Sequence, residues 1–177
     1  MKKFIPGLII FIFTLIFAIV GCHTISPVPD VASISSSGEG ILAPDFTLPD
    51  LSGNEVTLSS LRGKVVLLDF WATWCSPCLF AMPGLQKLHD KYEDKGLKVM
   101  SINLGESGAK VKKFIKENGL TYTILLDKSG NTGRIYNVRG IPTMILIDKN
   151  GIIQMKQVGY SRWQEEKIVE KIKELLD

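Results

Sequence analysis

The sequence predicts an α/β fold, with a central mixed β-sheet flanked by helices on both faces and a β-hairpin extension at the N-terminal side. Two patterns lead to this prediction. Short apolar runs of strand length alternate with longer segments in which apolar residues recur at helical spacing. Near the C-terminus, two such runs are separated only by Asp148-Lys149-Asn150-Gly151, a hairpin turn, so the sheet cannot be wholly parallel.

The N-terminal residues 1–22 indicate an export segment. Two lysines precede residues 4–20, which carry no charge, and small Gly21 stands directly before Cys22. This box resembles a bacterial lipoprotein cleavage site, and the resemblance implies that Cys22 becomes a diacylated N-terminus. The alternative is an uncleaved transmembrane anchor, since about 17 residues is the lower limit for spanning a bilayer. Both alternatives predict an extracytoplasmic, membrane-tethered protein.

Residues 23–40 are rich in Pro, Ser and Gly and predict a flexible linker, so the folded domain spans 41–177. At its start, residues 46–48 and 55–58 alternate apolar and polar side chains around a polar turn, which predicts the hairpin. The further strands are expected at residues 65–71, 97–104, 123–126, 144–147 and 152–158.

Four helices are expected among these strands. The first follows Cys75, the second begins after the capping residue Ser107, and the third is short, at 129–136. Ser161 and Gln164 form a capping box for the fourth. The inward-facing residues are predicted to be Met82, Leu85, Leu88 and Tyr92 in the first helix, Val111, Phe114, Ile115 and Asn118 in the second, and Ile168, Ile172 and Leu175 in the fourth.

Composition excludes several classes of protein. The chain has 177 residues, of which 45% are hydrophobic and 22% charged, so it is not wholly disordered. Lys plus Arg number 21 and Asp plus Glu 18, a net charge of +3, which gives no basic surface for a nucleic-acid partner. No later run resembles residues 4–20, so a polytopic membrane protein is excluded. We expect the domain to be monomeric.

A pair of cysteines carries the expected chemistry. Cys75 and Cys78 lie where the strand at 65–71 ends and the first long helix begins, and their spacing places both sulfurs within disulfide reach. At a helix start, unpaired N–H groups and the helix dipole favour an anion, so Cys75 is the expected thiolate nucleophile. Cys78, one turn into the helix, is expected to be more buried and to resolve a mixed disulfide.

Two other interpretations of the pair were weighed. A structural zinc site needs four ligands, but there is no second Cys pair, and His89 is expected to be an ordinary helix-surface residue. An inert structural disulfide would close a loop of only two residues, which constrains the unfolded chain little. We therefore expect a redox-active disulfide, Cys75–Cys78, with no metal and no organic cofactor.

Residues 69–78, with the sequence DFWATWCSPC, resemble the active-site segment of thioredoxins. Pro83 matches the proline that kinks the first long helix of that family. Ile141-Pro142-Thr143 matches the family's loop whose proline is cis and faces the disulfide. The resemblance implies a thioredoxin-like fold over about residues 41–177.

Three further segments, at 43–46, 58–64 and 99–106, resemble the membrane-tethered TlpA/ResA branch. That branch implies a thiol–disulfide oxidoreductase that reduces client proteins, typically the disulfide of an apocytochrome c haem motif. Its electrons usually come from a membrane thiol carrier. Members that act in cytochrome c maturation often carry a Glu three residues after the second Cys, where this chain has Ala81. This departure weakens the assignment of the client and leaves the reaction class untouched.

The remaining candidate residues surround the pair. Asp69 is the only charge in its strand; burial should raise its pKa, so that it can relay the proton of Cys78. The alternative is a structural acid with satisfied hydrogen bonds. Trp74, Ile141 and Pro142 are expected to contact the client, whose extended segment would pair with the backbone beside Pro142. Otherwise Trp74 is rim packing and Pro142 an ordinary trans proline.

Two rival functions remain. The hairpin also occurs in peroxiredoxin-like thiol peroxidases, but those need a Thr three residues before the reactive Cys, where this chain has Ala72. A copper-delivery lipoprotein would use a Cys-x-x-x-Cys motif with a distant His, which differs from the spacing here. The lysines at 110, 112, 113 and 116 are most simply a solvated helix face.

Overall fold

The computed structural model describes residues 40–177, apart from the side chains of Trp163 and Gln164. The export segment, Cys22 and the linker up to residue 39 lie outside the described residues, so the three-part division of the chain stays a prediction. The same holds for the capping box, because it needs the side chain of Gln164. Among residues 40–177, no helix is both long and apolar enough to cross a membrane.

A five-stranded mixed sheet forms the centre of the domain, in the order β5-β4-β3-β6-β7. β3 pairs in parallel with β4, and β4 with β5, whereas β6 is antiparallel to both β3 and β7. This arrangement confirms the predicted mixed sheet. The strands are β3 (Val65–Trp71), β4 (Leu97–Leu104), β5 (Thr123–Asp127), β6 (Thr143–Ile147) and β7 (Ile153–Val158).

The central strand β3 is buried along its whole length, as its nearly continuous apolar sequence predicts. Because side chains alternate across a strand, Val65, Leu67 and Trp71 join one core cluster, and Val66, Leu68 and Phe70 the other. Asp69, in the same alternation, faces the side of Leu67 and Trp71.

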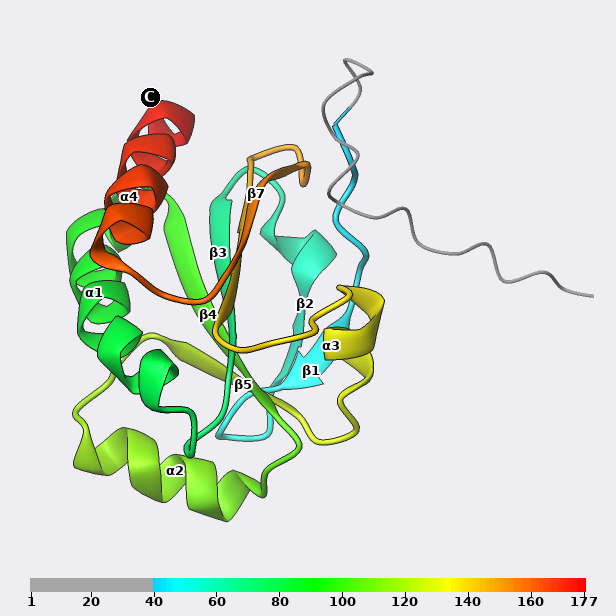
Figure 1. The fold of residues 1–177 in the computed structure, drawn as a ribbon. Helices are drawn as coiled ribbons and strands as arrows, with labels where there is room; N and C mark the ends of the chain where they lie inside the picture. Colours follow the sequence, from blue (N-terminus) through cyan, green and yellow to red (C-terminus); the bar gives the residue numbers. More distant parts are fainter. Residues whose placement is uncertain (1–39) are drawn as a thin grey trace, which may run out of the picture.

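Three longer helices cover that first face: α1 (Ser76–Tyr92), α2 (Gly108–Glu117) and α4 (Arg162–Leu176). Figure 1 shows α1 and α4 side by side along the sheet, with α2 below them. The predicted inward residues of α1 are all buried, and α1 continues through Pro83. Ser107 caps α2 as predicted, accepting a hydrogen bond from Lys110 N at 3.4 Å. Asn118 was wrongly placed in the core: it is exposed beyond the helix end and donates to the Phe114 carbonyl at 2.9 Å.

The opposite face of the sheet, that of Val66, Leu68 and Phe70, is covered by a β-hairpin and a short helix. The predicted hairpin, β1 (Thr47–Pro49) with β2 (Glu55–Thr57), forms a separate two-stranded sheet against it, followed by the 3-10 turn η2 (Leu58–Leu61). The short helix α3 (Asn131–Ile135) lies beside the hairpin (Figure 1). Helices therefore lie on both faces, as predicted, but most of the second face is covered by the hairpin. A second 3-10 turn, η3 (Glu93–Lys95), joins α1 to β4.

The topology brings three loops to one edge of the sheet. Parallel β3 and β4 both end there, since Trp71 pairs with Asn103. Antiparallel β6 begins there, with Thr143 opposite Phe70. The turn before α1, the loop after β4 and the loop before β6 therefore meet at one edge, and the cysteines lie on the first of them.

Candidate active site

A disulfide joins Cys75 and Cys78, with an S–S distance of 2.01 Å and Cα atoms 5.3 Å apart. Cys75 is the N-cap of α1, and its sulfur accepts a hydrogen bond from Cys78 N at 3.3 Å. A sulfur held in this position is well placed to carry negative charge when the bond is reduced, because helix-start N–H groups point at it. Cys78 is 1% exposed and Cys75 4%, so the expected difference in burial is present but small.

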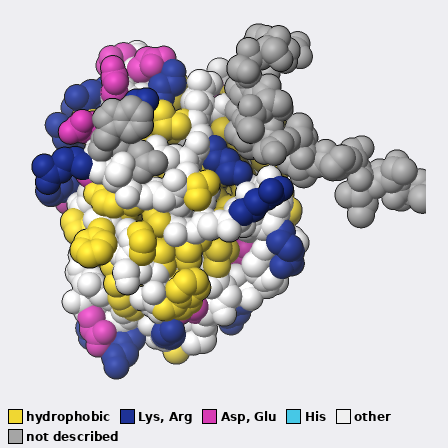
Figure 2. Space-filling view, viewed as in Figure 1, with side chains coloured by type: hydrophobic (Ala, Val, Ile, Leu, Met, Phe, Trp, Pro, Cys, Tyr) yellow, Lys and Arg dark blue, Asp and Glu magenta, His cyan; other side chains and the backbone are white. Residues whose placement is uncertain are grey.

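Large apolar side chains stand exposed on both sides of the buried disulfide. Trp74, directly before Cys75, is 70% exposed, and Phe80, two residues after Cys78, is 73% exposed. Leu79 is also exposed. On the face seen in Figure 2, hydrophobic side chains gather in the lower half, with charged side chains mainly at the margin. Several large apolar side chains exposed near one site are typical of a surface where another protein binds.

The loop before β6 adds an unpaired stretch of backbone to this edge. The Ile141–Pro142 peptide bond is cis, which confirms what the thioredoxin resemblance implied. Two hydrogen bonds fix the loop: Thr143 Oγ1 donates to the Gly140 carbonyl at 2.6 Å, and Gly159 N donates to the Pro142 carbonyl at 2.7 Å. Within residues 40–177, the N–H and C=O groups of Ile141 have no backbone partner, so they are the groups left for an added strand.

Asp69 lies beneath α1 and is 1% exposed. Burial raises the pKa of its carboxyl group to about 7, against the opposing effect of a hydrogen bond from Ser101. Ser101 Oγ donates to Oδ2 at 2.9 Å, and Oδ1 has no partner among the described residues. The direction of this pKa shift is the predicted one, and the alternative of a structural acid stays open. Whether the carboxyl group serves Cys78 stays a prediction.

Other buried polar atoms without a partner lie on the same face. Among the residues that the structure describes, these atoms are Trp71 Nε1, Asn103 Oδ1 and the hydroxyl oxygen of Tyr122. Trp71 and Asn103 are paired residues of β3 and β4, two positions along from the Asp69–Ser101 pair. Burial, and to a smaller extent the Asp69 charge, raises the pKa of Tyr122. Polar groups of this kind give Asp69 surroundings suited to an ordered water molecule.

Glu106 was not identified as a site residue from the sequence, although it lies in the loop after β4 and bonds to the turn that carries the cysteines. Its side chain is 8% exposed and accepts four hydrogen bonds. Thr73 N donates at 2.7 Å and Thr73 Oγ1 at 2.7 Å, Asn103 Nδ2 at 2.8 Å and Lys110 Nζ at 2.6 Å. Burial alone would raise the pKa of Glu106, but these bonds outweigh it and lower the pKa to about 2. A carboxylate directly after a strand parallel to β3 was the signal that could have found it.

Lys110 and His89 differ from what the sequence suggested. Lys110 belongs to the solvated helix face but also pairs with Glu106. The His89 side chain is 13% exposed rather than on the surface; it lies edge-on to Tyr122 and 3.2 Å from Glu93 Oε2. In the described part of the chain, no group of three or more His, Cys, Asp or Glu side chains could hold a metal ion.

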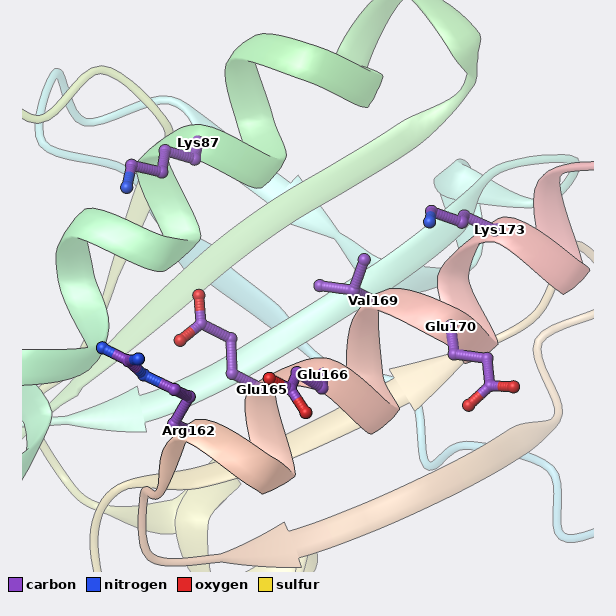
Figure 3. A pocket seen from close by; sticks show the side chains of 7 residues that line it. All are labelled: Lys87, Arg162, Glu165, Glu166, Val169, Glu170 and Lys173. Carbon is purple, nitrogen blue, oxygen red and sulfur yellow. The ribbon is translucent and has the colours of Figure 1, made fainter.

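An open groove of about 570 Å³ lies away from the disulfide, between α1 and α4. Figure 3 shows Lys87 reaching into it from α1, with the other labelled residues on α4. Its lining carries charges of both signs and shares no residue with the surroundings of the cysteines. Beside the cysteines, in contrast, the chain presents the exposed apolar side chains of Trp74, Leu79 and Phe80, which suit a protein client better than a small molecule.

A reactive dithiol at a helix start, a cis proline at the same sheet edge and the mixed sheet are features that comparison with known proteins can test. The model of the AhpC/TSA family matches residues 40–156. The chain belongs to this family. It is also 44% identical over 119 residues to the thiol-disulfide oxidoreductase ResA of Geobacillus kaustophilus, covering 67% of each chain.

Solved structures agree with this AhpC/TSA family member in fold. A chain assigned as thiol:disulfide interchange protein DsbE of Chlorobium tepidum superposes with a TM-score of 0.74 at 38% identity, covering 80% of this chain and 100% of that one. The pneumococcal exposed lipoprotein thioredoxin Etrx1 of Streptococcus pneumoniae gives a TM-score of 0.64 at 33% identity, covering 75% and 100%. The thioredoxin-like fold is thus confirmed, and the protein is a thiol–disulfide oxidoreductase.

Proposed function

We propose that this oxidoreductase reduces disulfides of client proteins outside the cytoplasm while tethered to a membrane. The observation that carries the proposal is Cys75 at the N-cap of α1, buried between exposed Trp74 and Phe80. The helix start stabilises a thiolate, and the apolar rim receives the client. The exposed lipoprotein among the similar structures supports tethering through a diacylated Cys22.

The proposed cycle begins with the reduced dithiol. The Cys75 thiolate attacks one sulfur of the client disulfide, which forms a mixed disulfide and releases the other client sulfur as a thiolate. Cys78 then loses its proton to Asp69 and attacks the Cys75 sulfur. The client leaves with both sulfurs reduced, and Cys75–Cys78 is the disulfide seen in this structure. A membrane thiol donor returns the two electrons, so the cycle needs no cofactor.

Client binding is proposed to use strand addition. Ile141 offers an N–H group and a C=O group without a backbone partner, and Pro142 is buried behind them. An extended segment could form two hydrogen bonds there while its apolar side chains meet Trp74. Apocytochrome c is one such client, but Ala81 is 2% exposed and supplies no carboxylate near the cysteines. We therefore propose clients with apolar residues beside the disulfide, without restriction to apocytochrome c.

A Cys78→Ser variant tests the assigned roles. It should hold clients as mixed disulfides with Cys75, because the resolving thiol is missing. Alkylation of the reduced wild-type protein at pH 6–7 should label Cys75 well before Cys78, and the opposite order would reverse the roles.

A glutathione titration should give a reduction potential nearer roughly −270 mV than −120 mV if the protein is a reductant. Mass spectrometry of the mature N-terminus decides between a lipidated Cys22 and an intact Met1.

Thiol peroxidase is the competing function. The position three residues before Cys75 is Ala72, which is 0% exposed and has no hydroxyl group to orient a peroxide. The nearby hydroxyl group of Thr73 is already bonded to Glu106. We expect no peroxide consumption above that of a free dithiol, and turnover of peroxide at enzymatic rates would favour the competing function.

A further inference from the structure

We propose that Glu106 is a positioning residue that presents Trp74 to the client by holding the Ala72–Trp74 turn through Thr73. The inference concerns the reducing reaction itself, and it rests on the proposed contact between Trp74 and the client. The hydrogen-bond partners of Glu106 among the described residues are Thr73, Asn103 and Lys110, and not the cysteines, so it acts through the turn that leads to them.

The two ends of the turn, Ala72 and Cys75, are buried, whereas Trp74 is exposed. Trp74 is 70% exposed, so packing holds its side chain only weakly. Inside the turn, Cys75 N donates to the Ala72 carbonyl at 3.1 Å, which closes the chain between Ala72 and Cys75. The remaining anchor is Thr73, whose N–H and hydroxyl groups both bond to the Glu106 carboxylate at 2.7 Å. Hydrogen bonds to an ionised acceptor are about twice as strong as neutral ones.

Glu106 itself is fixed from the other side. Asn103, the β4 residue paired with Trp71, donates to the Glu106 carboxylate at 2.8 Å. Lys110, in the first turn of α2, donates at 2.6 Å. The carboxylate thus ties the turn before α1 to both the end of β4 and the start of α2, although Glu106 lies 33 residues after Thr73 in the sequence. A turn held in this way keeps the exposed indole in one place before the client arrives, which lowers the entropic cost of binding.

The geometry separates two kinds of substrate. A peptide with a disulfide flanked by apolar residues needs Trp74, whereas a small aromatic disulfide needs only access to Cys75. Glu106→Gln keeps the shape of the side chain but turns one acceptor oxygen into a donor, which faces other donors. We expect its rate constant toward the peptide to fall about tenfold and its rate constant toward the small disulfide to change less than about twofold.

A double-mutant cycle with Trp74→Ala decides the mechanism. If Glu106 acts by placing Trp74, adding Glu106→Gln to Trp74→Ala should cause no further loss toward the peptide. Full additivity of the two losses would overturn the proposal. If Trp74→Ala alone left the peptide rate unchanged, the proposed client contact would fail instead, so the two failures are distinguishable.

Two further variants complete the experiment. Thr73→Val removes the hydrogen bond from the hydroxyl group but keeps the one from the N–H group, so the rate constant toward the peptide should fall by about threefold. This variant replaces Glu106→Gln if Glu106→Gln does not fold. Lys113→Gln is the matched control, since Lys113 lies in the same helix as Lys110 but forms its exposed ion pair with Glu117 rather than with Glu106. A loss in Thr73→Val no larger than that in Lys113→Gln would contradict the proposal. Equal losses toward both substrates would also overturn it, because they would show a general effect on Cys75.

Discussion

Two shielded carboxyl groups lie at the same end of the sheet and behave in opposite ways. Asp69, in β3 beneath α1, is 1% exposed, and the Glu106 side chain, after β4, is 8% exposed. Asp69 accepts one hydrogen bond, from a side chain, and its pKa rises to about 7. Glu106 accepts four, three from side chains and one from the Thr73 backbone, and its pKa falls to about 2. Asp69 is buried more deeply and Glu106 accepts more hydrogen bonds, and both differences separate the two pKa values.

The difference suits the two groups to different work. A group with a pKa near 7 can accept and return a proton under ordinary conditions, as the proposed step at Cys78 requires. A group that stays ionised at every physiological pH transfers no proton but holds its donors firmly. One region beneath α1 is therefore available for proton transfer, and the other, at the rim, for positioning.

The largest expected effect is on stability. The pKa of Asp69 is raised in the folded protein, so the folded state binds more protons than the unfolded state between about pH 4 and 7, and stability falls as pH rises through that window. Asp69→Asn removes this loss. The free energy of unfolding of the variant minus that of wild type should therefore be roughly 4 kcal/mol larger above pH 7 than at pH 4. Urea unfolding of the oxidised full chain from pH 4 to 8 measures it, and parallel curves for the two proteins would show that Asp69 is ionised throughout.

The same variant should slow resolution of the mixed disulfide. Asparagine cannot take the proton of Cys78, and loss of a general base typically costs about a hundredfold in rate. Initial attack by Cys75 should change much less, because its thiolate is favoured by the helix start. Stopped-flow reduction of a disulfide peptide separates the two steps. Resolution at the wild-type rate from pH 6 to 8 would leave Asp69 a structural residue.

Glu106→Ala should destabilise the folded protein, whereas Asp69→Asn should stabilise it. It leaves the N–H group of Thr73 and the amide of Asn103 without their acceptor, which should cost about 2 kcal/mol at pH 7. Because the folded pKa of Glu106 is lowered, its stabilising contribution is present above about pH 4.5 and is lost as pH falls through about 2. The stability difference between wild type and variant should therefore shrink toward pH 2 in the same urea titrations. A difference that is constant over that range would contradict the contrast with Asp69.

These two residues also show what could and could not be predicted from the sequence. The apolar run around Asp69 predicted its strand, its burial and the direction of its pKa shift, because all three depend on local pattern. The predicted strand bounds agree with the structure to within one residue, and the hairpin and α1 follow from equally local signals. Glu106 was missed as a site residue because two of its donors belong to Thr73, 33 residues earlier. Long-range hydrogen bonding leaves no period in a sequence.

A smaller effect is expected from Ser101→Ala. Ser101 supplies the one side-chain hydrogen bond that opposes the effect of burial on Asp69. Without it, the pKa of Asp69 should rise further, by about one unit, and the protonated form should persist to higher pH. Difference infrared spectra of the carboxyl band against Asp69→Asn measure the titration. A pKa that falls in Ser101→Ala would mean that the hydroxyl group acts on the protonated form instead.

The smallest effect is expected for Lys110→Gln. This variant tests which of the four hydrogen-bond donors to the Glu106 carboxylate holds it in place. Lys110 Nζ lies 2.6 Å from Oε1, but its side chain is 57% exposed, so water and salt screen the pair. Exposed pairs of this kind contribute about 0.5 kcal/mol. The three donors from Thr73 and Asn103 remain in the variant, so the carboxylate should stay ionised and the turn before α1 in place. Urea unfolding at pH 7 should show a loss of about that size, decreasing further when salt is raised to about 1 M. A loss as large as that of Glu106→Ala would show that the ion pair, rather than the bonds to the turn and to β4, fixes this carboxylate.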